Sequence, residues 1–125
     1  MTNFKFIIYH NNRCSKSRTV LEVFKKKNID FEIINYLKNP INLSFLHKVL
    51  LTLDNDISSV IRTNEKIFKK VYIHKKINFN IESVIKIVKE YPILLQRPIV
   101  AITKNNELIK SKICRPPELI YEFLK

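Results

Sequence analysis

The sequence predicts one α/β domain, residues 1–125, built on a mixed β-sheet. An apolar run at residues 4–9 is followed by an amphipathic segment and then by a β-branched run, which is the βαβ pattern. Near the C-terminus, two apolar runs flank an asparagine turn, and a proline-led segment follows. The order is therefore βαβ, a helical insertion at about 41–90, and ββα. A chain of 125 residues is long enough to bury a core of its own.

The first βαβ unit occupies residues 4–36. Residues 4–9 are predicted to form a buried strand, and residues 15–27 a helix whose apolar side includes Val20 and Phe24. The lysines at the end of this helix suit the negative end of its dipole. Residues 31–36 predict a second strand, parallel to the first because a right-handed crossover joins them.

The insertion is predicted to be helical. Asn39-Pro40 breaks the chain, and Asn42 or Ser44 can cap a helix that runs through Leu53. Further helices are expected at 57–62, 65–71 and 80–90.

The C-terminal part is predicted to be a hairpin and a helix. Strands at 99–102 and 108–113 flank Lys104-Asn105-Asn106, since asparagine tolerates the left-handed φ of a tight turn. Pro116-Pro117 opens a last helix that runs to Lys125, because proline suits the first helical turn.

The composition excludes several functional classes. The net charge is +12, but the lysines are scattered through every segment, which favours a solvated basic surface over a nucleic-acid site. The absence of glycine and the excess of lysine, isoleucine and asparagine fit an A+T-rich codon bias. No zinc-ligand spacing predicts a metal site. No apolar run approaches the roughly 20 residues that span a bilayer, and no signal-peptide pattern is present, so we expect a cytoplasmic protein.

Cys14 is the residue most suggestive of chemistry. It follows the first strand and precedes the first helix, so its sulfur is expected at the positive end of the helix dipole. Arg13, Lys16 and Arg18 lie within four residues of it, and His10 precedes it. Such an environment stabilises a thiolate. An inert core cysteine is the alternative, which these polar neighbours disfavour; His10 could also simply pack at the end of the strand.

Arginine is scarce in this chain, which has 18 lysines and five arginines: Arg13, Arg18, Arg62, Arg97 and Arg115. The planar guanidinium makes bidentate contacts to tetrahedral oxyanions that lysine cannot copy. Taken singly, each arginine could equally be the partner of a surface ion pair.

Four stretches of the chain resemble the glutathione/glutaredoxin-linked arsenate reductases, a family with a thioredoxin-like fold. They are residues 8–18, 60–65, 91–100 and 114–118, and they occur in the order of that family's motifs. One difference is visible, because Asn12 stands where the family usually has proline.

The resemblance implies a role for each matching residue. Cys14 would attack arsenate, His10 would help to keep the thiol ionised, and Arg62, Arg97 and Arg115 would hold the oxyanion. Pro98 would be a cis proline beside the active-site loop. Further contacts to the substrate would come from Asn11, Arg13, Ser15, Ser17, Arg18 and Pro98.

The resemblance also implies the partners. A Cys14–arsenate adduct would be attacked by glutathione as co-substrate, and glutaredoxin would clear the mixed disulfide. The second thiol must come from outside, because Ser17 stands where a C-x-x-C motif has its second cysteine. We expect a monomer with no tightly bound cofactor, and a structural role for Cys114.

Two alternatives stay open. One is a non-enzymatic Spx-like regulator that binds RNA polymerase, although such regulators typically carry the C-x-x-C motif that Ser17 removes. The other is a repurposed thiol oxidoreductase that acts on a different oxyanion or on a glutathione conjugate.

Overall fold

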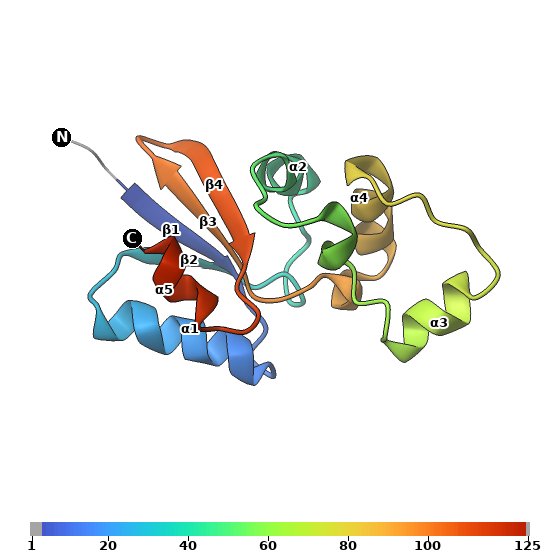
Figure 1. Cartoon of the computed structure of the whole chain (residues 1–125), viewed down its shortest axis with the longest axis horizontal. Helices are drawn as coiled ribbons and strands as arrows, with labels where there is room; N and C mark the ends of the chain where they lie inside the picture. The colour runs from blue at the N-terminus through green and yellow to red at the C-terminus, as the bar shows by residue number, and fades with distance from the viewer. Residues whose placement is uncertain (1–3, 125) are drawn as a thin grey trace.

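The computed structural model describes residues 4–124, which contain a four-stranded mixed sheet with the strand order β2-β1-β3-β4 (Figure 1). The strands are β1 (Phe4–Tyr9), β2 (Phe31–Ile34), β3 (Ile99–Lys104) and β4 (Glu107–Ile113). β1 and β2 are parallel, and β1–β3 and β3–β4 are antiparallel. The predicted βαβ unit and hairpin are therefore confirmed, although β2 ends two residues earlier than predicted.

Helices cover both faces of the sheet. The long helix α1 (Ser15–Lys26) and the short α5 (Leu119–Phe123) lie on one face (Figure 1). The segment between β2 and β3 is helical, as predicted. It contains α2 (Leu43–Leu51), η1 (Ile57–Val60), α3 (Lys66–Tyr72), α4 (Ile81–Glu90) and η2 (Pro92–Leu94), of which η1 and η2 are single 3-10 turns.

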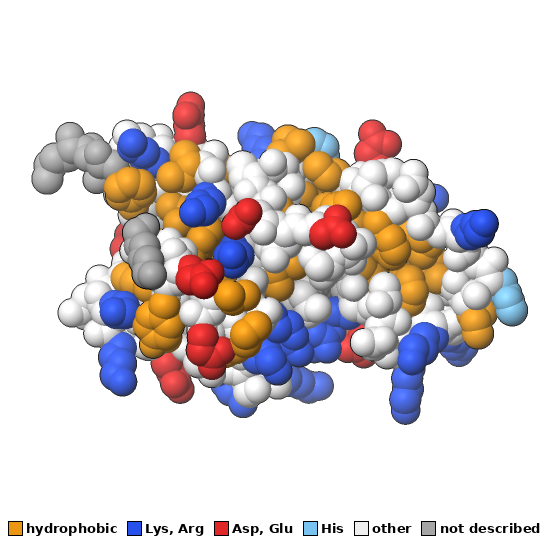
Figure 2. Space-filling view, in the orientation of Figure 1, with side chains coloured by type: hydrophobic (Ala, Val, Ile, Leu, Met, Phe, Trp, Pro, Cys, Tyr) orange, Lys and Arg blue, Asp and Glu red, His pale blue; other side chains and the backbone are white. Residues whose placement is uncertain are grey.

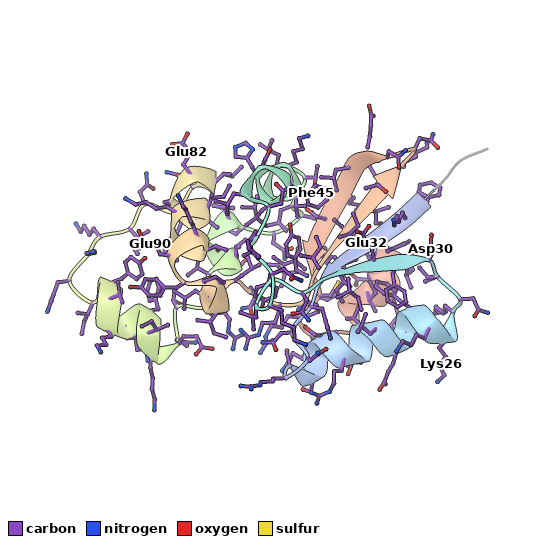
Figure 3. The ribbon with its side chains drawn as sticks, turned by 180° about the vertical axis from the view of Figure 1, so that it is seen from behind. Lys26, Asp30, Glu32, Phe45, Glu82 and Glu90 are labelled. Atoms are coloured by element: carbon purple, nitrogen blue, oxygen red, sulfur yellow. The ribbon has the colours of Figure 1, made fainter. Side chains whose placement is uncertain are left out.

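The alternation of side chains along β1 separates two hydrophobic cores. Ile8 packs with apolar residues of α1 and α5, whereas Ile7 and Tyr9 pack with the helical insertion. Phe45 of α2 lies between its helix and the strands and packs against the core that contains Ile7 and Tyr9 (Figure 3). The sheet is therefore covered on both faces.

Asparagine side chains supply the local signals that glycine would otherwise give. The Asn42 side chain caps α2, and Asn80 forms a capping box with Ser83 at the start of α4. Asn105 and Asn106 adopt φ values of 51° and 70° in the β3–β4 turn, which confirms the predicted hairpin.

The last helix differs from the prediction, because it begins at Leu119 and not at Pro116. The carbonyls of Pro116 and Pro117 accept hydrogen bonds from residues three positions later, so this stretch forms tight turns before the helix starts. The predicted end, Lys125, lies outside the described residues. Within residues 4–124, no helix is both long enough and apolar enough to cross a membrane.

One row of paired residues crosses the whole sheet and defines the edge at which the predicted site residues meet. Ile34 pairs with Tyr9, Tyr9 with Ile99, and Ile99 with Ile113. The chain leaves β1, β2 and β4 just beyond this row and enters β3 just before it. Segments that are more than 100 residues apart in sequence therefore meet at one edge of the sheet.

Candidate active site

Cys14 lies at this edge, as the N-cap residue of α1. A turn after β1 holds it in place, because its backbone N–H donates to the Asn11 carbonyl over 3.0 Å. Its own carbonyl accepts from the Arg18 N–H over 3.1 Å, which starts the helix. The thiol is half-buried, as a nucleophile that must meet a soluble substrate requires.

The surroundings of Cys14 favour the thiolate. Burial acts to raise the pKa of this thiol, but the backbone N–H and the hydroxyl of Ser17, the Arg115 guanidinium and the Lys16 N–H together lower it from 9.0 to about 7. The Cys14 side chain makes no capping hydrogen bond, and Ser17 Oγ makes no conventional hydrogen bond, so Ser17 acts on the thiol through weaker contacts. Nearly half of the thiol is therefore ionised at neutral pH.

Arg115 is the arginine closest to the sulfur. Its Nη1 lies 3.7 Å from Cys14 Sγ and also donates to the Arg97 carbonyl over 3.1 Å. Figure 2 shows Lys and Arg side chains gathered at the lower middle of the molecule, around the start of α1. Arg115, which lies 101 residues from Cys14 in sequence, thus adds to the cationic environment predicted around this thiol.

Arg97 and Pro98 enter the site from the start of β3. The Arg97–Pro98 peptide bond is cis, as the resemblance implied, and Arg115–Pro116 is cis as well. Arg97 Nη1 donates to the Ile93 carbonyl, which anchors the guanidinium to η2. Its Nε is buried and has no hydrogen-bond partner among the described residues.

The backbone of the insertion brings Arg62 to the same edge. Ile61 and Leu95 form an isolated antiparallel bridge, and the Arg62 N–H donates to the Leu94 carbonyl. The guanidinium is held by two side chains, because Nε contacts Glu65 Oε1 over 3.0 Å and Nη1 contacts Gln96 Oε1 over 2.7 Å.

A cavity of about 500 Å³ opens between Arg62 and Arg115. Polar side chains line much of it, including Ser59, Thr63 and Gln96. This volume lies in the range of small-molecule sites, about 300–1,000 Å³. The two arginines can therefore reach a small anion in the same space.

His10 lies close to the loop, and its side chain is buried. Burial lowers its pKa, and Arg18 and Lys25 act in the same direction, although a contact to Asn12 opposes them. The neutral ring is thus favoured at neutral pH, so the positive charge near Cys14 comes from Arg115 and the helix. His10 Nε2 lies 2.6 Å from Asn12 Oδ1, so the residue that replaces the usual proline holds the ring.

The other predicted contact residues divide into two groups. Ser17 is fully buried in the first turn of α1. Asn11 and Arg18 stabilise the loop itself. Asn11 Oδ1 accepts from the Arg13 N–H, and Arg18 Nη1 donates to the Asn12 carbonyl over 2.7 Å. The side chains of Arg13 and Ser15 are exposed.

Cys114 is unsuited to act as a second reactive thiol. It packs in the core between the sheet, α1 and α5, and burial raises its pKa to about 12. Both cysteines are free thiols. The burial of Cys114 supports the structural role predicted for it.

Sequence reasoning missed three residues at this site. Gln96 and Glu65 hold Arg62. The i,i+3 spacing of Arg62 and Glu65 was a signal for an ion pair, whereas Gln96 lies 34 residues from Arg62 in sequence. Tyr36 is 2% exposed and follows β2 at the same edge as Cys14. Its place at the end of the predicted second strand, residues 31–36, was a signal that could have found it, since parallel strands end at the same edge of a sheet.

Comparisons with known proteins agree with this geometry. The model of the ArsC family matches residues 9–123. An arsenate reductase of Haemophilus influenzae is 33% identical over 119 residues, covering 94% of this chain and 97% of the relative. The uncharacterised protein YfgD of Escherichia coli is 32% identical over 118 residues, covering 94% of both chains.

A solved structure gives the same result in three dimensions. The arsenate reductase from Vibrio cholerae superimposes with a TM-score of 0.80 at 27% identity, covering 95% of this chain and 97% of its own. The predicted thioredoxin-like fold is thereby confirmed. With a family match over nearly all of its length, the chain belongs to the ArsC family.

Proposed function

We propose that this protein reduces arsenate to arsenite by one-thiol chemistry at Cys14, with glutathione and glutaredoxin as reductants. The observation that carries the proposal is the half-buried Cys14 thiol, with a pKa of about 7 and the Arg115 guanidinium 3.7 Å from its sulfur. The similarity to named arsenate reductases supports arsenate as the oxyanion.

The arginines address the main electrostatic obstacle. A thiolate and an arsenate anion repel each other, so their approach requires compensating positive charge. Arg115 contacts the Cys14 sulfur and also donates a hydrogen bond to the Arg97 carbonyl. Arg62 and Arg115 line the same cavity. Fixed cations at the developing charge lower the barrier most when they need no reorganisation.

The reaction we propose has two chemical steps. The Cys14 thiolate attacks arsenic, forming a sulfur–arsenic bond while one oxygen leaves as water after protonation. A glutathione thiolate then attacks the Cys14 sulfur, and the electron pair of the sulfur–arsenic bond stays on arsenic, which leaves as arsenite. Cys14 ends in a mixed disulfide with glutathione, which glutaredoxin reduces.

An external second thiol suits the arrangement around Cys14. Ser17 stands at the position of a resolving cysteine, and Cys114 is buried with a pKa of about 12. We propose that the protein works as a monomer in the reducing cytoplasm, where glutathione is available, and that it needs no tightly bound cofactor.

A coupled assay tests this function. It contains arsenate, glutathione, glutaredoxin and glutathione reductase, and NADPH consumption is the readout. We expect turnover by the wild type, none by Cys14→Ser, and most of the wild-type rate for the matched control Cys114→Ala. A folded wild type without turnover would overturn the proposal and favour a non-enzymatic role, and equal losses in both variants would contradict the assignment of Cys14.

A further inference from the structure

Four buried polar atoms lack a hydrogen-bond partner among the described residues: His10 Nδ1, Ser17 Oγ, Tyr36 Oη and Arg97 Nε. All four belong to segments that meet at the sheet edge around Cys14. Native proteins rarely bury polar atoms without partners, because the loss of hydration is then uncompensated. Three of these residues were already assigned to the site, but Tyr36 has no role so far.

The topology places Tyr36 next to the catalytic loop. It lies two residues beyond Ile34, the last residue of β2, and the His10 N–H donates to the Ile34 carbonyl over 3.0 Å. The Tyr36 ring packs on Tyr9, the last residue of β1, with ring centroids 6.4 Å apart. Tyr36 follows the end of β2, and the Cys14 loop follows the end of β1. Because these two strands are adjacent and parallel, the two segments lie side by side.

Charged groups of the site act on the Tyr36 hydroxyl. Burial raises the pKa of Tyr36, whereas the Arg97 guanidinium acts to lower it through its charge and through a contact with the hydroxyl; the Cys14 and Arg62 charges also act on it. The contact between Tyr36 and Arg97 does not meet the geometry of a hydrogen bond, so the hydroxyl keeps its capacity to donate one. The hydroxyl therefore keeps its proton at neutral pH and can donate a hydrogen bond. Neighbouring Tyr9 is equally buried, but only burial acts on its pKa, so it does not face these charges.

We propose that the Tyr36 hydroxyl donates a hydrogen bond to the oxyanion held at Cys14, beside Arg97, which makes Tyr36 a further substrate-binding residue. This inference rests on the proposed function. A phenol adds a directional donor to a site whose other donors are mostly cationic. It thus orients a tetrahedral oxyanion without adding more positive charge near the thiolate.

Tyr36→Phe tests the inference, since it removes only the hydroxyl and keeps the ring contact with Tyr9. A hydrogen bond to a charged group is worth about tenfold or more in affinity, so we expect kcat/KM for arsenate to fall by at least about tenfold. The midpoint of thermal unfolding without oxyanion should stay the same or rise, because a buried hydroxyl without a partner is lost. The rise in that midpoint on adding arsenate should shrink. Tyr9→Phe is the matched control and should keep the wild-type values.

Several outcomes would overturn the inference. The first is that Tyr36→Phe keeps the wild-type kcat/KM and the wild-type rise in unfolding midpoint on adding arsenate. The second is that Tyr36→Phe lowers the midpoint without oxyanion but leaves the effect of arsenate on the midpoint unchanged. The second outcome would indicate that the hydroxyl is purely structural. Sulfate and phosphate serve as additional probes in the same measurement. If the wild type is stabilised by these anions but does not reduce arsenate, the proposed function fails while the Tyr36 test remains valid with the other anions.

Discussion

The Ser17 hydroxyl offers the most direct test of how the fold ionises Cys14. The difference between the ordinary pKa of 9.0 and the value of about 7 corresponds to about 2.7 kcal/mol in favour of the thiolate. Ser17 contributes through both its backbone N–H and its hydroxyl, and Ser17→Ala removes only the hydroxyl.

A hydrogen bond to a charged group contributes about 1.5–3 kcal/mol, and a long contact to sulfur retains only part of this. We therefore expect Ser17→Ala to raise the pKa of Cys14 by about 1, which is about 1.4 kcal/mol. The thiolate fraction at pH 7 would fall from about one half to about one tenth.

The rate of Cys14 alkylation by iodoacetamide, measured from pH 5 to 10, reports this pKa directly. The measurement is made in a Cys114→Ala background, so that only one thiol reacts. Ser15→Ala is the matched control, because Ser15 is exposed in the same turn and is not among the groups that lower the pKa. An unchanged pKa in Ser17→Ala, or an equal rise in both variants, would refute the assignment of the hydroxyl.

The same ionisation couples stability to pH. The pKa of folded Cys14 is depressed, so its contribution is fully present above the unfolded value of 9.0 and is lost as pH falls toward 7. Because the thiol is half-exposed, solvent screening reduces the expected contribution to about 1–1.5 kcal/mol. The wild type should therefore gain this much unfolding free energy over Cys14→Ser between pH 7 and 9, as urea denaturation would measure. A constant difference between the two proteins across this interval would argue against a depressed pKa.

Three further substitutions test individual contacts of the site. Glu65→Gln should lower the KM for arsenate by about twofold to fivefold, because Arg62 is released from an ion pair worth up to about 1 kcal/mol; a raised KM would show that Glu65 instead holds Arg62 in its active position. Asn12→Ala should lower the midpoint of thermal unfolding by about 3–5 °C, since buried His10 loses a partner at 2.6 Å. An unchanged midpoint in calorimetry would mean that the contact contributes nothing. Arg97→Lys should reduce kcat/KM despite keeping the charge, because the planar fork is lost, and a wild-type rate would contradict the need for that geometry.

Local signals in the sequence were sufficient for most of the fold. The apolar run at residues 4–9, the asparagine caps and the Asn105-Asn106 turn each depend on neighbours within a few residues. The last helix was misplaced because Pro116 and Pro117 favour tight turns as well as helix starts, and only tertiary packing decides between them.

The site was harder to predict, because its partners come from distant segments. Cys14 was recognisable from its position after a strand, but the contact of Arg115 with its sulfur spans 101 residues. The hydrogen bond between Arg62 and Gln96 joins segments that are paired by an isolated β-bridge between residues 61 and 95. The charge state of His10 could not be read from its neighbours, since burial and not charge is the main influence on its pKa.

The row of paired residues across the sheet has a consequence for how this chain tolerates sequence drift. Tyr9, Ile34, Ile99 and Ile113 are aligned by the backbone ladders of the sheet, whose hydrogen bonds do not depend on the identity of the side chains. A loop can therefore exchange proline for asparagine, and the surface can fill with lysine, while the spacing of the reactive groups is preserved. Substitutions that shift the strand register would change the spacing of the reactive groups, so this chain would not tolerate them.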